Sequence, residues 1–172
     1  MNEFDIVNKA KNKDQNAFKI LFKEYSPKIY AFSLRLSLDT RLAEEITQET
    51  FIKVWFKLET FRFESKFSTW IFGIAYNEFL TQLRNNRRLE NKHNEAAEIG
   101  LEKFKDVIHF DTNIDLEYSI AKLPEKQKTV FLLYELEGYK HKEISEILGI
   151  SEGTSKTHLH TAKKFLKKEL LK

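Results

Sequence analysis

Apolar residues recur every three or four positions along most of the chain, which is the period of an α-helix. A first stripe runs on both sides of Pro27 and holds Phe18, Leu21, Phe22, Tyr25, Ile29, Phe32 and Leu36. Asp39 or Thr40 can cap a second helix, whose apolar positions are Leu42, Ile46, Phe51, Val54, Trp55 and Leu58. Ser68 can cap a third, which carries Ile71, Phe72, Ala75, Tyr76, Phe79 and Leu83. The pattern predicts an all-helical first domain over residues 4–90.

Residues 91–112 are polar, acidic and weakly periodic, so we interpret them as a linker. Helical periodicity returns with Leu116, Ile120 and Leu123. Pro124 suits the first turn of another helix, because the N–H that it lacks would be unpaired there. That helix carries apolar residues from Val130 to Leu136, and Gly138 is predicted to end it, since glycine readily adopts the left-handed conformation found at helix C-termini. We therefore expect an all-α protein of two small helical domains, the second over residues 113–172.

A helix-turn-helix is predicted by HKEISEILGISEGTSKTHLHTAKKFLKK, residues 141–168. Gly149 can adopt the left-handed conformation of a tight turn, Ile150 fills the angle between the helices, and Ser151 is a good N-cap. Leu159, Ala162, Phe165 and Leu166 would face inward. The outward positions are Thr154, Lys156, Thr157, His158, Thr161, Lys163 and Lys164. In a helix-turn-helix this second helix enters the major groove, which favours DNA binding; a plain helical hairpin with a basic surface is the alternative.

Charge is unevenly distributed along the chain. The net charge is only +3, but residues 89–119 hold three lysines and eight acids (−5), and residues 154–172 hold six lysines and one acid (+5). Blocks of this kind indicate an acidic connector and a basic working end. The longest apolar runs fall far short of a membrane span, and no signal-peptide pattern follows Met1. The absence of cysteine excludes disulfides and fits a cytoplasmic protein.

Six aromatic residues gather in FRFESKFSTWIFGIAYN, residues 61–77. Phe72 and Tyr76 lie on the helical stripe and are expected in the core. Phe61, Phe63 and Phe67 precede the expected Ser68 cap, where no helical stripe requires them. We expect these three to form an exposed rim, with Trp70 suited to either role.

Four motifs in this order resemble the sigma factors of bacterial RNA polymerase: AEEITQETF (43–51), FSTWI (67–71), LPEKQK (123–128) and EILGISEGT (146–154). Residues 44–88 resemble the second conserved sigma domain, and residues 116–168 resemble the fourth. A short linker and the lack of a third domain are similar to the extracytoplasmic-function (ECF) group. The resemblance implies a protein that joins core polymerase, directs it to promoters and assists DNA melting.

The resemblance also implies which residues act. Glu45, Gln48 and Glu49 would bind the clamp helices of the largest polymerase subunit, and they share one helix face. The unpaired −10 strand would contact Phe61, Phe63, Lys66, Phe67, Ser68, Trp70 and Asn77. The sugar-phosphate backbone of that strand would contact Arg84, Arg87 and Arg88. Ser151 and Glu152 would join the outward positions of the second helix at the −35 duplex. The implied partners are core polymerase, including its flap, promoter DNA and a cognate anti-sigma factor, which would hold the protein in the cytoplasm or at the inner membrane face.

Several positions depart from the family pattern. His158 and Thr161 stand where two arginines are common, which predicts a −35 readout less directed at guanine. Tyr76 replaces a common arginine. Ser145 and Ser155 replace small hydrophobic residues of the helix-turn-helix, and we expect them to loosen its packing slightly.

Other functions have less support. The Glu90–His93 spacing is used in di-iron bundles, but no second such pair exists, so no metal site is predicted. No phosphate-binding loop or hydrolase motif is present, and we expect neither an enzyme nor a cofactor or small-molecule substrate. A helix-turn-helix regulator with a ligand-binding or dimerising domain is the main alternative; a helical adaptor that binds only proteins is a weaker one.

Overall fold

A computed structural model describes residues 2–90 and 114–171, and side chains at 88–90 are outside its description. The predicted linker, 91–112, and the Glu90–His93 pair therefore lie outside the described residues. The described parts are helical throughout, with no strand among them. This confirms the all-α prediction.

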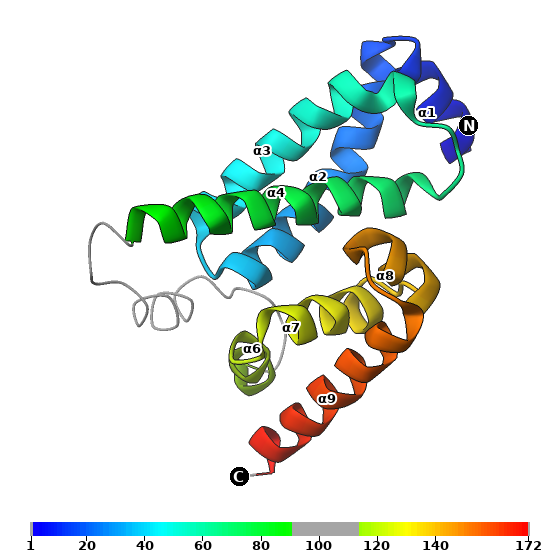
Figure 1. The fold of residues 1–172 in the computed structure, drawn as a ribbon. Coiled ribbons are helices and arrows are strands. Elements are labelled where there is room, and N and C mark those ends of the chain that lie inside the picture. Colours follow the sequence, from blue (N-terminus) through cyan, green and yellow to red (C-terminus); the bar gives the residue numbers. More distant parts are fainter. Residues whose placement is uncertain (1, 91–113, 172) are drawn as a thin grey trace.

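The N-terminal group contains four α-helices and one 3-10 turn. They are α1 (Glu3–Lys11), α2 (Gln15–Ser37), α3 (Thr40–Lys57), η1 (Leu58–Thr60) and α4 (Phe67–Glu90). Helices α2, α3 and α4 pack against one another, and α1 packs on α2 (Figure 1). The Asp39 side chain caps α3 by accepting a hydrogen bond from the N–H of Leu42 at 3.0 Å. Of the two predicted caps, Asp39 and Thr40, the cap is therefore Asp39. The expected Ser68 cap is wrong, because α4 already begins at Phe67.

The C-terminal group contains α6 (Ile114–Ala121), α7 (Glu125–Phe131), the π-turn η2 (Leu132–Leu136), α8 (His141–Leu148) and α9 (Glu152–Leu170). Gly138 and Gly149 have φ values of +74° and +65°, which confirms both predicted turns. The Ser151 side chain caps α9 by accepting from the N–H of Thr154 at 3.0 Å. Helices α8 and α9 thus form the predicted helix-turn-helix.

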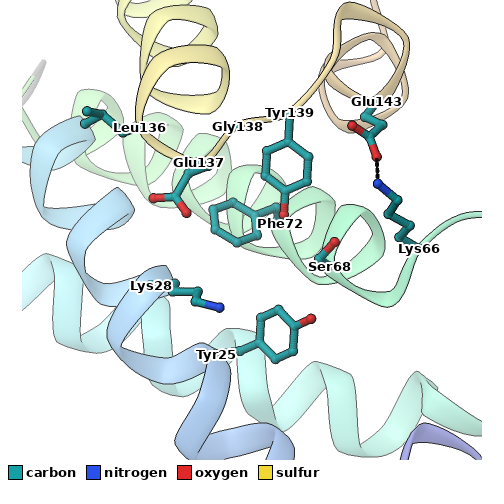
Figure 2. Close-up of a pocket in the computed structure, with 10 residues that line it drawn as sticks. All are labelled: Tyr25, Lys28, Lys66, Ser68, Phe72, Leu136, Glu137, Gly138, Tyr139 and Glu143. Carbon is teal, nitrogen blue, oxygen red and sulfur yellow. Dashed lines mark ion pairs between the residues drawn. The ribbon is translucent and has the colours of Figure 1, made fainter. Parts of the chain in front are cut away.

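The π-turn η2 widens the end of the α7 helix just before Gly138. The N–H of Glu137 donates to the carbonyl of Leu132 at 3.1 Å, a five-residue step in place of the four-residue step of an α-helix. Downstream of the turn, Tyr139 is buried and directed at α4 (Figure 2). Tyr134 and Leu136, two of the apolar residues of this segment, are exposed.

One hydrophobic core runs through both helical groups. It contains Phe32 and Phe72 of the N-terminal group together with Leu133, Tyr139 and Ile147 of the C-terminal group. The Phe72 ring lies between the other two aromatic rings, with its centroid 5.3 Å from that of Phe32 and 5.3 Å from that of Tyr139. The two groups therefore pack as one body in this structure.

Lys128 of α7 is buried, with 6% of its surface exposed. Burial lowers the pKa of Lys128 to about 8 from 10.5, and the charge of Glu125 opposes this only in part. Between about pH 8 and pH 10 the unfolded chain therefore holds a proton here that the folded chain has released, so the free energy of unfolding rises with pH. Above pH 10 the trend reverses, because burial raises the pKa of Tyr25, Tyr76 and Tyr139.

Lys128→Met is expected to abolish this rise and to increase the free energy of unfolding at pH 7 by about 1–2 kcal/mol. Urea denaturation between pH 7 and pH 10 measures both effects. Lys126→Met is the matched control, since Lys126 is the exposed lysine two positions earlier. Equal pH slopes for the native chain and Lys128→Met would contradict the burial of a titrating lysine.

Candidate functional site

The outer face of α9 is polar and basic, as predicted. Among the positions expected to contact DNA, Glu152, Thr154, Lys156, Thr157, Thr161 and Lys164 are exposed. His158 is half-buried, because it lies beside Leu148 and Ile150 and across a cavity from Tyr76. The face is therefore continuous, with His158 at its edge toward the N-terminal group.

Two of the expected contact residues have partners within the protein. Ser151 shares a hydrogen bond of 2.8 Å with the hydroxyl of Thr154 in addition to capping α9. The Lys163 ammonium pairs with Glu135, which raises the pKa of Lys163, although its side chain remains 53% exposed. The Ser151 side chain therefore stabilises the first turn of α9, and Lys163 forms an ion pair with a residue of η2.

Ser155 is completely buried where the family pattern has a small hydrophobic residue. Its hydroxyl lies 2.9 Å from Nδ1 of His141, the first residue of α8. The Ser145 hydroxyl donates to the carbonyl of Lys142 at 2.6 Å within α8. Both serines are therefore hydrogen-bonded, and Ser155 links the two helices of the motif, whereas we had expected the pair to loosen it.

The loop before α4 corrects the expectation of an exposed aromatic rim. Phe61 and Phe67 are only 4% and 3% exposed, and both belong to the core. Phe67 is the first residue of α4 and lies four positions before the buried Ile71, so the wrongly placed cap concealed its position on the buried side of that helix. Its ring also packs edge-on against Tyr25 of α2, at 5.2 Å between centroids. The buried rings anchor the loop.

Phe63, the third expected rim residue, is half-buried and holds the loop against α1. Its ring centroid lies 4.7 Å from that of Phe4 and 5.1 Å from the ammonium of Lys11. Lys11 also donates a hydrogen bond to the carbonyl of Phe61. Phe63 has a φ of +58°, which is unusual for a bulky side chain and marks a sharp backbone turn. No sequence pattern indicated that α1 supports this loop.

Trp70 of α4 lies at the rim of a small hollow with Phe61. The hollow has a volume of about 230 Å³ and is lined by Thr60, Phe61, Arg62, Glu64, Ser65 and Trp70. Trp70 is half-buried, with its ring 5.0 Å from that of Phe61. Part of the Trp70 side chain is thus accessible beside an exposed arginine, Arg62, that was not among the expected contact residues.

The remaining candidates of α4 lie along one side of the helix and at its end. Lys66 and Asn77 are exposed, and Ser68 is half-buried beside Tyr139. Arg84 and Arg87 are exposed on the last turns, while the Arg88 side chain lies outside the described residues. The face is polar at its start and cationic at its end.

Helix α3 presents an aligned stripe to solvent, which we call the α3 outer face: Glu45, Gln48, Glu49, Ile52 and Phe56. Spacings of three and four residues place these side chains on one side of the helix, opposite the buried Ile46, Phe51 and Val54. Ile52 and Phe56 are 49% and 67% exposed, which is high for large apolar side chains. These two were not among the candidates, although their four-residue spacing from Gln48 could have indicated them.

Two kinds of site are not found among the described residues. No described helix is both long and apolar enough to cross a membrane. In residues 2–90 and 114–171 no group of three histidine, aspartate or glutamate side chains is placed to hold a metal ion.

Comparison with known proteins assigns the family. Residues 21–89 match the family described as Sigma-70 region 2, and residues 114–166 match Sigma-70, region 4. The chain is 32% identical to the ECF RNA polymerase sigma factor SigW of Bacillus subtilis (strain 168), in an alignment that covers 95% of this chain and 94% of SigW. The chain belongs to the ECF RNA polymerase sigma factors. This sigma factor is also 27% identical to the RNA polymerase sigma-H factor of Pseudomonas aeruginosa, over 96% of this chain and 92% of that relative.

Two solved structures share the fold of this sigma factor. One is the sigma factor RpoE in complex with the anti-sigma factor NepR from Bartonella quintana, with a TM-score of 0.75, 24% identity, and coverage of 89% of this chain and 96% of that one. The other is CnrH in complex with the cytosolic domain of CnrY, with a TM-score of 0.69, 19% identity, and coverage of 96% and 94%. At these identities the likeness concerns the fold alone.

Proposed function

We propose that this sigma factor divides its work among three surfaces: the α3 outer face binds core RNA polymerase, the loop 61–66 with α4 holds the unpaired −10 strand, and α9 reads the −35 duplex. The observation that carries the proposal is that one chain combines a basic recognition helix with an aromatic hollow beside exposed cations. A helix-turn-helix regulator would need only the first of these.

For the −35 duplex we propose contacts from the exposed positions of α9. Lys156 and Lys164 are available to phosphates, which attract cations irrespective of sequence. Thr154 and Thr157, near the start of the helix, and His158 and Thr161 further along it, are the candidates for base edges. Because no arginine lies on this face, the fork-shaped contact that arginine makes with guanine is not available here. Ser151 and Glu152 would lie at the helix entrance, and Lys163 would have to leave Glu135 to reach DNA.

For the −10 strand we propose that a flipped base enters the hollow beside Trp70. Stacking a base on an aromatic ring contributes about 1–3 kcal/mol, and unstacking one costs a few kcal/mol. Two or three captured bases therefore offset local melting without ATP. Lys66, Ser68 and Asn77 would hold the strand along α4, and Arg84, Arg87 and Arg88 its backbone. Phe61 and Phe67 would act by shaping the loop, because they are buried, and Phe63 would do so because its ring is engaged by Phe4 and Lys11 of α1.

For core polymerase we propose that polar and apolar residues of the α3 outer face act together. Glu45, Gln48 and Glu49 would bind the clamp helices, with Ile52 and Phe56 packing beside them. Exposed apolar side chains next to polar ones are typical of protein interfaces, where aromatic residues are enriched. The C-terminal group would contact the flap.

We further propose an anti-sigma factor as a partner, by analogy with the RpoE and CnrH complexes, and a cytoplasmic location to match a partner in transcription. We propose no enzymatic activity of its own: the relatives are sigma factors, and their name describes a subunit of polymerase.

The test of this function is run-off transcription with purified core polymerase and a library of genomic promoter fragments. We expect promoter-specific products that require both the polymerase and this chain. Binding of a duplex operator in the absence of polymerase, without any run-off product, would favour the regulator instead.

Trp70→Ala is expected to weaken the binding of a single-stranded −10 oligonucleotide by about tenfold, because the stacking surface is lost. Fluorescence anisotropy with the non-template strand of a promoter found in the run-off assay measures this. Trp70→Phe should retain most of the affinity, and Trp55→Ala is the control for loss of a tryptophan on α3, away from the loop. Equal affinity for Trp70→Ala and the native chain would remove the hollow from the proposed site.

A further inference from the structure

The centre of the exposed face of α9 is a row of three positions, Gly153, Thr157 and Thr161. Successive members are four residues apart, so they lie one above the other on the helix, opposite the buried Leu159 and Leu166. Helices α6, α7 and α8 pack on that opposite side of α9 (Figure 1), and both threonines are exposed. The two threonines therefore lie in the middle of the surface proposed to enter the major groove.

Both threonine hydroxyls are bonded within α9 itself. Oγ1 of Thr157 donates to the carbonyl of Gly153 at 3.0 Å, and Oγ1 of Thr161 donates to the carbonyl of Thr157 at 2.9 Å. A bond to the carbonyl four residues earlier is a known arrangement of threonine in a helix, and it turns the hydroxyl toward the backbone. Because the Cβ of threonine carries one hydroxyl and one methyl, the methyl is the group left to meet a partner.

The bonded hydroxyls disfavour guanine at the bases that they face. Guanine presents only acceptors in the major groove, N7 and O6, and the one hydrogen of each hydroxyl is already donated to a backbone carbonyl. To donate to guanine, Thr157 or Thr161 would have to break a bond inside the helix. An A·T pair makes no such demand, because thymine presents a C5 methyl that a threonine methyl can contact.

Gly153 leaves the start of this row open. A Cβ at Gly153 would meet only Oγ of Ser151, at 3.8 Å, so no close contact among the described residues requires a glycine here. Glycine also weakens a helix relative to alanine. An approaching partner accounts for the missing side chain, because its absence lets DNA come close beside the Thr157 methyl.

We propose that Thr157 and Thr161 set the −35 specificity of this sigma factor through their methyl groups, each packed against the C5 methyl of a thymine, so that the base pairs opposite them are A·T pairs. This rests on the proposed function, since it assumes that α9 enters the major groove of the −35 duplex. The two threonines are about 6 Å apart along the helix, on the order of two base-pair steps of B-DNA. They therefore read nearby positions of one element.

Replacement of thymine by uracil tests the methyl contacts, because uracil lacks only the C5 methyl and pairs in the same way. Each thymine on either strand of the −35 element of a promoter found in the run-off assay is replaced in turn. The affinity of core polymerase carrying this sigma factor is then measured by competition. We expect affinity to fall about fourfold at each of two positions, and about fifteenfold when both are replaced, as for one and two buried methyl groups. Equal affinity for thymine and uracil at every position would overturn the proposal.

Two substitutions at each threonine separate the methyl from the hydroxyl. Thr157→Ser and Thr161→Ser keep the hydroxyl and remove the methyl, so each should lose about fourfold in affinity and become insensitive to uracil at one position. Thr157→Val and Thr161→Val keep a methyl and remove the hydroxyl, so each should remain sensitive to uracil.

Thr81→Ser is the matched control for these variants. Thr81 is exposed on α4, and its hydroxyl makes the same kind of bond, to the carbonyl of Asn77 at 2.9 Å. This control should leave the sensitivity to uracil in the −35 element unchanged. If the valine variants become insensitive to uracil while the serine variants stay sensitive, the hydroxyls read the bases and the proposal is overturned.

The outcomes separate this proposal from the proposed function. Normal run-off that is indifferent to uracil would leave the sigma mechanism intact and overturn the methyl contacts. Absence of run-off from every promoter would count against the sigma mechanism. Duplexes selected from a random pool by the free chain at low salt, where phosphate contacts are strongest, then decide the base preference. Selected duplexes that bind equally well after uracil replacement would overturn the proposal, and a fourfold loss at two thymines would support it.

Discussion

Replacing Phe56 with aspartate is expected to weaken binding to core RNA polymerase by about a hundredfold. Phe56 is 67% exposed at the end of the α3 outer face, in line with Gln48 and Ile52. Truncation of a hot-spot side chain in the fully covered centre of an interface costs about 2 kcal/mol or more, roughly 30-fold in affinity. The aspartate would also leave a carboxylate without a partner in the covered surface.

The exposure of Phe56 makes this a clean test of binding. Because the side chain contributes little to the core of the free protein, the unfolding transition should be almost unchanged. Affinity for fluorescently labelled core polymerase is the measurement, and Phe56→Leu, which keeps an apolar side chain, should lose less than tenfold. Native affinity in Phe56→Asp would exclude this end of α3 from the interface.

Phe72→Ala is expected to lower the free energy of unfolding by about 3–5 kcal/mol, the usual cost of removing a fully buried aromatic ring. Phe72 is 1% exposed and contacts Phe32 of α2 and Tyr139 of the C-terminal group. Its removal leaves a cavity where the two helical groups meet, so both should lose stability.

Urea denaturation followed by circular dichroism measures this loss. Phe22→Ala is the matched control, since Phe22 lies 43% exposed on α2 and should cost only about 1 kcal/mol. A loss in Phe72→Ala no larger than that of the control would show that the ring is not part of a shared core.

The sequence was sufficient for features that depend on neighbours in the chain. Helical periodicity located the helices on both sides of the linker. Asp39 and Ser151 were identifiable as caps because a cap bonds to a backbone N–H three residues away. Gly138 and Gly149 were identifiable because few other residues adopt a positive φ.

Features that depend on distant segments were not predictable in this way. Phe61 belongs to no helical stripe, yet it is buried, because its ring packs against Phe67 and Trp70 of α4 and because Lys11 of α1 bonds to its carbonyl. Phe22 lies on the first stripe but is 43% exposed, because it packs against Phe51 of α3 at the margin of the core. Periodicity gives the direction of a side chain on its own helix and does not reveal which other helix covers it.

The contact between the two helical groups depends on the most distant segments of all and was the least predictable feature of the fold. Arg35 and Glu117 form a buried ion pair although they are 82 positions apart, and neither belongs to a motif. Each was consistent with an ordinary solvated surface until the fold brought them together. The proposed sites could be located on individual helices from the sequence, but the contact between the two helical groups could not.

The π-turn η2 has a consequence for how lengths may vary among related chains. Its wider step uses one residue more than an α-helix needs for the same advance. Deleting one residue between Leu132 and Leu136 would let the segment close into an ordinary α-helix without turning the residues after it, because the extra residue is held within the wide turn. Tyr139 would then still face Phe72. A single-residue gap in an alignment at this position would therefore mark a sigma factor that lacks the π-turn but whose two halves meet in the same way.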